Sequence, residues 1–167
     1  MTMRKGLFIG INHYAHVAPL SGCNNDAMAM ASVLERHASG RPNFSSKVLT
    51  SAEEQLTLQH MKQQIQSLFS GDCDVALLYF AGHGQFDTSI DEGLLIPQDF
   101  KHGGEGIRIS DILLWADQAS QIKNKIVILD CCQAGAAAAM RGLRGGSSVI
   151  GEGMTILTAC KKEEAAM

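Results

Sequence analysis

The sequence has no cluster of basic residues and no long apolar segment. Its net charge is −3, and without a basic stripe it lacks the electrostatic signature of a nucleic-acid-binding protein. No apolar run approaches the roughly 20 residues that a membrane-spanning helix needs. The N-terminal MTMRKGLFIGIN has no small-residue cleavage site, so it is better interpreted as a core strand than as a signal peptide. These absences predict a cytoplasmic protein with neither a nucleic-acid nor a membrane partner.

The Cys-x-x-Cys spacing of thiol redox proteins is also missing. The chain has five cysteines, an odd number, and two of them, Cys131 and Cys132, are adjacent. A disulfide framework is therefore a poor interpretation, and reduced thiols are expected. Cys73 stands at the start of an apolar run, where a cysteine is usually a packing residue. The adjacent pair raises the question of which thiol is used chemically.

Apolar runs alternate with amphipathic segments along the 167 residues, which is the length of one domain. The apolar runs predict strands at 5–11, 45–50, 74–82, 92–99, 124–132 and 153–160. The amphipathic segments predict helices at 24–38, 51–68 and 110–119. This alternation predicts an α/β fold with a mostly parallel central sheet flanked by helices on both faces.

The helical patterns also predict which side chains are buried. The first helix is expected to bury the residues that share one face, Met30, Val33, Leu34 and His37, with Met28 as a further core residue. Ser51 and Glu54 have the spacing of a capping box, so they are expected to start the second helix.

Two apolar runs end in reactive residues, His83 after the run at 74–82 and Cys132 at the end of the run at 124–132. Functional groups of parallel sheets gather beyond the carboxyl ends of the strands, so both side chains are expected at the same edge. A cysteine acts as a nucleophile in the thiolate form, and a nearby imidazole lowers its pKa and moves its proton. The Gly84 amide next to His83 is placed to help hold an oxyanion.

These motifs carry a family resemblance. LYFAGHGQ at 78–85 and DCCQAG at 130–135 resemble the His and Cys motifs of the caspase-like cysteine peptidases, closest to metacaspases and their prokaryotic relatives. Three further stretches, LSGCNNDAMAM, DEGLLIPQD and LTACKKEEAA, resemble other segments of that family in the same order. The resemblance implies a caspase-hemoglobinase-like fold and a cysteine endopeptidase with His83 and Cys132 as its catalytic dyad. It also implies an oxyanion hole formed by the Gly84 and Cys132 amides.

The resemblance also implies a specificity pocket. Caspases that cleave after aspartate carry an arginine where this chain has Leu20, whereas metacaspases use two aspartates, at positions that match Asp26 and Asp130. Cys23 and Ala81 are implied to line the same S1 pocket, Ala81 standing where the family has a serine. Carboxylates in such a pocket favour a basic P1 side chain, Arg before Lys because of its bidentate geometry. Asp26 has an alternative as an acid in the first turn of a helix, and the two roles are compatible.

The resemblance divides the chain into a large-subunit region at 1–135, a linker-like loop at 136–152 and the start of a small-subunit region at 153–167. Arg141 and Arg144 in the loop are candidate self-cleavage sites, with an uncut surface loop as the alternative. The family fold continues with one more strand and helix. The chain is therefore expected to be a fragment, a processed large subunit or an unusually short member.

No cofactor is predicted. Asp87, Asp91 and Glu92 are acidic enough to contribute to calcium binding, but they lack a clear ligand spacing, so calcium activation is left open. His13, His16 and Cys23 are too loosely spaced for a metal site, which leaves a structural loop as the better interpretation. The expected partners are protein or peptide substrates and a sensor or regulatory protein. The alternative function is a catalytically weak caspase-like interaction module, or a large-subunit fragment that needs a missing partner segment.

Overall fold

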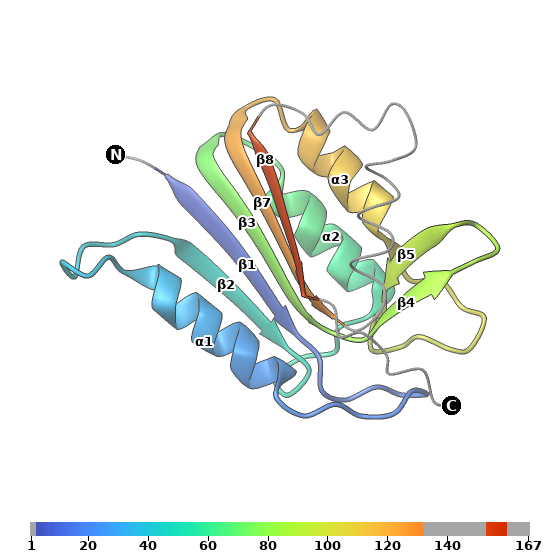
Figure 1. Ribbon diagram of the computed structural model, residues 1–167. Coiled ribbons are helices and arrows are strands. Elements are labelled where there is room, and N and C mark those ends of the chain that lie inside the picture. The colour runs from blue at the N-terminus through green and yellow to red at the C-terminus, as the bar shows by residue number, and fades with distance from the viewer. Residues whose placement is uncertain (1–2, 132–152, 160–167) are drawn as a thin grey trace.

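Five parallel strands form the central sheet of the part of the chain that the computed structural model describes, residues 3–131 and 153–159 (Figure 1). Their order across the sheet is β2-β1-β3-β7-β8. The strands are β1 Arg4–Gly10, β2 Ser45–Thr50, β3 Cys73–Gly82, β7 Ile122–Cys131 and β8 Met154–Ala159. All neighbouring pairs are parallel, so their carboxyl ends meet at one edge of the sheet.

Helices cover both faces of this sheet, as the sequence predicts (Figure 1). They are α1 Cys23–Glu35, α2 Leu58–Leu68 and α3 Ile109–Gln118. One core cluster lies between the sheet and α1, and a larger one lies between the sheet and the pair α2 and α3. This two-sided burial explains why β1 and β3 read as nearly continuous apolar runs. In the part of the chain that the structure describes, no helix is long and apolar enough to cross a membrane.

A small antiparallel sheet adjoins the carboxyl edge of the central one (Figure 1). It consists of β4 Gly84–Asp87, β5 Glu92–Leu95 and β6 Ile107–Arg108. β4 follows β3 after the single residue His83, so the chain turns from the parallel sheet into this hairpin at the predicted catalytic histidine.

The predicted core face of α1 is confirmed only in part, since Met30 and Leu34 are partly buried and pack against the core. The buried residues of the helix are Asn24, Ala27 and Ala31, whereas Val33 is 73% exposed and Met28 is 44% exposed. His37 lies beyond the last residue of the helix. The reason is a close approach between α1 and β1 at Gly10, where a β-carbon would lie 2.3 Å from the Cys23 carbonyl oxygen. Only small side chains fit under a helix held so near to the sheet.

The close approach at Gly10 leaves no room for a larger side chain. The substitution Gly10→Ala should lower the free energy of unfolding by about 1–3 kcal/mol, because the new methyl group meets helix backbone that must shift. For a domain of this size, the melting temperature should fall by about 2–4 °C for each kcal/mol. Thermal unfolding followed by circular dichroism measures the change.

Val33→Ala is the matched control within α1, because this side chain is exposed and its truncation should change the stability by less than about 0.5 kcal/mol. Equal destabilisation by the two substitutions would contradict the close packing of α1 against β1 at Gly10.

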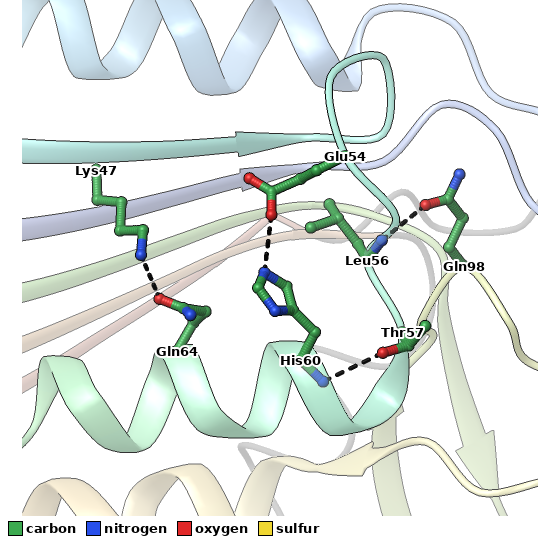
Figure 2. Close-up of polar contacts among 7 residues, drawn as sticks. All are labelled: Lys47, Glu54, Leu56, Thr57, His60, Gln64 and Gln98. Atoms are coloured by element: carbon green, nitrogen blue, oxygen red, sulfur yellow. Dashed lines mark hydrogen bonds and ion pairs between the residues drawn. The ribbon is translucent and has the colours of Figure 1, made fainter.

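The predicted capping box of α2 is also wrong. The helix begins at Leu58, and its N-cap is Thr57, whose side-chain oxygen accepts a hydrogen bond from the His60 amide (Figure 2). Glu54 instead pairs with the His60 ring, with 2.9 Å between Oε2 and Nε2. The loop before α2 is held by Gln98, whose Oε1 accepts from the Leu56 amide at 2.8 Å (Figure 2). Tertiary hydrogen bonds therefore move the helix start beyond the local sequence signal.

Candidate active site

The carboxyl ends of β3 and β7 bring the predicted catalytic segments together. Gly82, the last residue of β3, is the register partner of Cys131, the last residue of β7. His83 directly follows the first of these residues, and Cys132 directly follows the second. Cys132 lies outside the described residues.

His83 is held from two sides by the loop after β1. Its amide donates a hydrogen bond to the Tyr14 hydroxyl at 2.7 Å, and the two rings pack with centroids 4.8 Å apart. Its Nε2 lies 2.8 Å from the Ala18 carbonyl oxygen. A carbonyl only accepts, so Nε2 carries the proton and Nδ1 is the nitrogen able to accept one. The arrangement therefore fixes the orientation of the ring and leaves Nδ1 as its proton acceptor.

Gly82 allows this packing. A β-carbon at this position would lie 2.7 Å from the Tyr14 hydroxyl oxygen, closer than a side chain there permits. Burial raises the pKa of the Tyr14 phenol above its usual range. The hydrogen bond from the His83 amide opposes that shift, while Cys23 and Cys131 add to it. Tyr14 therefore stays neutral, and it holds His83 through ring packing and one hydrogen bond rather than through a charge.

Polar contacts at the ends of β1 and β2 anchor this loop. The Ser51 hydroxyl accepts hydrogen bonds from the amides of Asn12 at 2.9 Å and His13 at 3.3 Å, and it lies 3.2 Å from Asn24 Oδ1. The Leu20 amide closes the loop by donating to the Asn12 carbonyl at 2.8 Å. The residue predicted as a helix cap thus fixes the loop that carries Tyr14 and Ala18.

The Gly84 amide faces away from the neighbouring strand. Gly84 is the register partner of Leu95, and the Ile96 amide donates to the His83 carbonyl at 3.0 Å. Hydrogen-bonded and non-hydrogen-bonded pairs alternate along an antiparallel ladder, so Gly84 and Leu95 form a non-hydrogen-bonded pair. The N–H of Gly84 consequently makes no hydrogen bond to β5. An oxyanion donor must be available in this way.

Two carboxylates, Asp26 and Asp130, form an acidic cluster around Tyr79 at the carboxyl edge of the sheet. Asp130 and Asp26 are both exposed, and Asp130 Oδ2 accepts a hydrogen bond from the Tyr79 hydroxyl at 3.2 Å. Burial raises the pKa of the Tyr79 phenol above its usual range, and the Asp130 charge, the hydrogen bond to it and the charges of Asp26 and Cys23 raise it further. Both carboxylates and Cys23 therefore lie within electrostatic range of one phenol.

The remaining predicted pocket residue, Ala81, is only 1% exposed and packs in the core beneath α1. Cys131 packs in the core on the opposite face of the sheet, with α2 and α3, and Cys73 is buried there too. The expectation that Cys73 is a packing residue is thus confirmed. Side chains alternate across a strand, so Asp130 and Cys131 point to opposite faces.

Several predicted residues are not described by the structure: Cys132, Arg141, Arg144 and the linker-like loop 136–152. Within residues 3–131 and 153–159, no group of three or more His, Cys, Asp and Glu side chains is placed to hold a metal ion. Asp87, Asp91 and Glu92 do not form such a group, and neither do His13, His16 and Cys23.

Sequence reasoning missed three residues that organise the site: Tyr14, Ala18 and Tyr79. Ala18 acts through its backbone carbonyl, which no residue pattern reveals. The tyrosines had a usable signal, because the chain contains only two and one of them lies within the histidine motif itself. A scarce amphipathic residue at the carboxyl end of a buried strand is a candidate for a polar contact.

The described site thus lies at the carboxyl edge of a parallel sheet in an α/β protein. It consists of an oriented histidine, His83, and two carboxylates, Asp26 and Asp130. Residues 3–167 match the family model for the caspase domain, and the chain belongs to that family. The membership confirms the resemblance seen in the sequence and makes this a caspase-like domain of the cysteine peptidases.

The chain is similar to metacaspases. It is 27% identical to metacaspase-2 of Trypanosoma brucei brucei over 197 aligned positions, which cover 96% of this chain and 54% of that protein. It is 28% identical to metacaspase-1 of Pyricularia oryzae over 147 positions, covering 80% and 37%. The chain thus spans about half the length, or less, of the curated relatives it matches.

Two solved structures share the fold. Protein GSU0716 of Geobacter sulfurreducens has a TM-score of 0.59 at 20% identity, covering 84% of this chain and 54% of that one. Pro-sf-caspase-1 has a TM-score of 0.56 at 14% identity, covering 79% and 47%. At these identities the likeness concerns the fold alone, and it confirms the predicted caspase-like architecture.

Proposed function

We propose that this chain is a cysteine endopeptidase that cleaves protein substrates after a basic P1 residue, Arg before Lys. The observation that carries the proposal is the orientation of His83 by Tyr14 and Ala18 beside the strand end that Cys132 follows. A nucleophile, a base and a group that orients the base are the parts that covalent catalysis needs.

In the proposed reaction, the Cys132 sulfur attacks the scissile carbonyl carbon and its proton passes to Nδ1 of His83. The amides of Gly84 and Cys132 stabilise the oxyanion. His83 then protonates the leaving amine as the thioester forms. Water, deprotonated by the same imidazole, attacks the thioester carbon. The C–S bond then breaks, the acid product leaves, and the imidazolium returns its proton to the Cys132 sulfur.

The acidic cluster supports the proposed P1 preference. Asp26 and Asp130 are exposed at the same edge as His83, and Leu20 supplies no cation there. A guanidinium matches a carboxylate with two parallel hydrogen bonds, whereas an ammonium offers a point charge. A P1 aspartate would meet like charge, which costs binding energy.

A panel of fluorogenic peptides that differ only at P1 tests the proposal on the whole chain. We expect kcat/KM to be highest for Arg and lower for Lys. For Asp it should be at least about 100-fold lower than for Arg, because the Asp26 and Asp130 carboxylates repel a P1 carboxylate and form ion pairs with a P1 guanidinium. Prior treatment with iodoacetamide should remove the activity, since it alkylates the thiolate.

Cleavage after Asp as fast as after Arg would contradict the specificity. No cleavage of any peptide would favour the interaction module or a fragment that needs a partner segment.

A further inference from the structure

We propose that Tyr79 is a positioning residue for substrate specificity, which holds the Asp130 carboxylate in place to receive a basic P1 side chain. This inference rests on the proposed function. The phenol is buried, with 3% of the residue exposed, yet its hydroxyl reaches an exposed carboxylate and donates to Oδ2 at 3.2 Å. One end of the side chain is thus fixed in the core while the other end orients a surface group.

The strand register explains why a tyrosine is needed. Asp130 on β7 has Ala81 as its register partner on β3, and the methyl group of Ala81 cannot donate a hydrogen bond. Tyr79 lies two positions earlier on β3, hence on the same face, opposite Ile128. Two residues along a strand span about 6.6 Å. Among side chains with a hydroxyl, only tyrosine is long enough to bridge this step.

The charges favour the same role. Tyr79 lies among acidic groups, with Asp130 in contact and Asp26 in electrostatic range, and the result is a phenol that stays protonated in the working range of pH. The Tyr79 hydroxyl therefore donates a hydrogen bond to Asp130 at every working pH, and it carries no negative charge that would draw the P1 cation away from Asp130. Each carboxylate oxygen has two lone pairs, so Asp130 can accept from Tyr79 and still bind a guanidinium.

The test uses two peptides that differ only in P1 arginine or P1 citrulline, its neutral isostere. For the wild-type chain, the ratio of kcat/KM between them measures the contribution of the pocket charge. In Tyr79→Phe, we expect this ratio to fall about 10-fold, as loss of a hydrogen bond to a charged group allows. The change should come from a raised KM for the arginine peptide, with the citrulline peptide nearly unaffected.

A rescue separates positioning from mere stability. Adding Ala81→Ser to Tyr79→Phe places a new hydroxyl at the register partner of Asp130 and should restore most of the ratio. Tyr14→Phe is the comparison variant, because it removes the other phenol of this edge. It should change the rates of both peptides together and leave their ratio within about 2-fold, since Tyr14 contacts His83 rather than Asp130.

The outcomes are distinct. A wild-type chain that does not prefer arginine overturns the proposed function and this inference with it. A wild-type chain that prefers arginine, with a Tyr79→Phe variant that keeps the ratio or slows both peptides equally, overturns this inference alone. If Tyr79→Phe shows no cooperative unfolding transition, Tyr79→Met is measured in its place and judged by the same ratio.

Discussion

Replacement of Cys132 by alanine is expected to lower kcat/KM for a P1-arginine peptide by about 10⁴- to 10⁶-fold, whereas replacement of Cys131 leaves it within about 2-fold. The difference follows from the strand alternation at the end of β7. Cys131 is 4% exposed and packs in the core with α2 and α3, on the face opposite Asp130. Cys132 is the next residue in the chain, and Cys131 is the register partner of Gly82, the residue before His83. A buried thiol in apolar surroundings is inert, while a thiol beside an oriented imidazole is reactive.

A second readout makes this prediction independent of peptide choice. Intact-mass measurement after brief exposure to iodoacetamide should show one rapidly alkylated thiol in the wild type and in Cys131→Ala, and none in Cys132→Ala. Rapid alkylation that persists in Cys132→Ala would mean that another cysteine is the nucleophile.

Replacement of His83 by alanine is expected to lower kcat by about 10²- to 10⁴-fold, the usual contribution of a positioned general acid and base. KM for the same peptide should change little, because His83 does not contact the acidic cluster in the described site. The residue is oriented through Nε2 by the Ala18 carbonyl at 2.8 Å and through its amide by Tyr14. Steady-state kinetics with the P1-arginine peptide measures both parameters.

The pH dependence of alkylation adds a sharper test of the same role. Without the imidazole, Cys132 should titrate at the usual pKa of a free thiol. Its alkylation rate in His83→Ala should therefore rise about tenfold per pH unit below that value, while the wild type stays reactive near neutral pH. His102 is an exposed histidine on the loop between β5 and β6, so His102→Ala is the control and should match the wild type.

A fall in kcat of less than 10-fold in His83→Ala would contradict its role as the base.

Much of the fold was predictable because it depends on patterns that are local in sequence. The apolar runs of β1, β3 and β7 are nearly continuous, and such runs separated by amphipathic segments form parallel sheets covered on both faces. The order of motifs also predicted the caspase-like family, which the match over residues 3–167 confirms. The carboxyl-edge rule placed His83 correctly, since connections in a parallel sheet return every strand in the same direction.

The helix faces were less predictable because they depend on what each helix meets. In α1, the apolar periodicity suggested Val33 as a core residue, but the helix packs through Ala27 and Ala31. The decisive residue is Gly10, far away in sequence, which lets the backbone of α1 approach β1 closely. In the same way, α2 begins at Leu58 with Thr57 as its N-cap, because the Ser51 hydroxyl binds the loop after β1 instead.

The sequence by itself determined the class of fold, the family and the identity of the candidate base and carboxylates, because these are carried by residue types in a fixed order. Only the tertiary structure decided how they are held. Tyr14 and Ala18 orient His83, and Tyr79 holds Asp130, through contacts that join residues 51 to 69 positions apart. Such contacts depend on strand register and on the space left by Gly82, and neither is expressed in any local pattern.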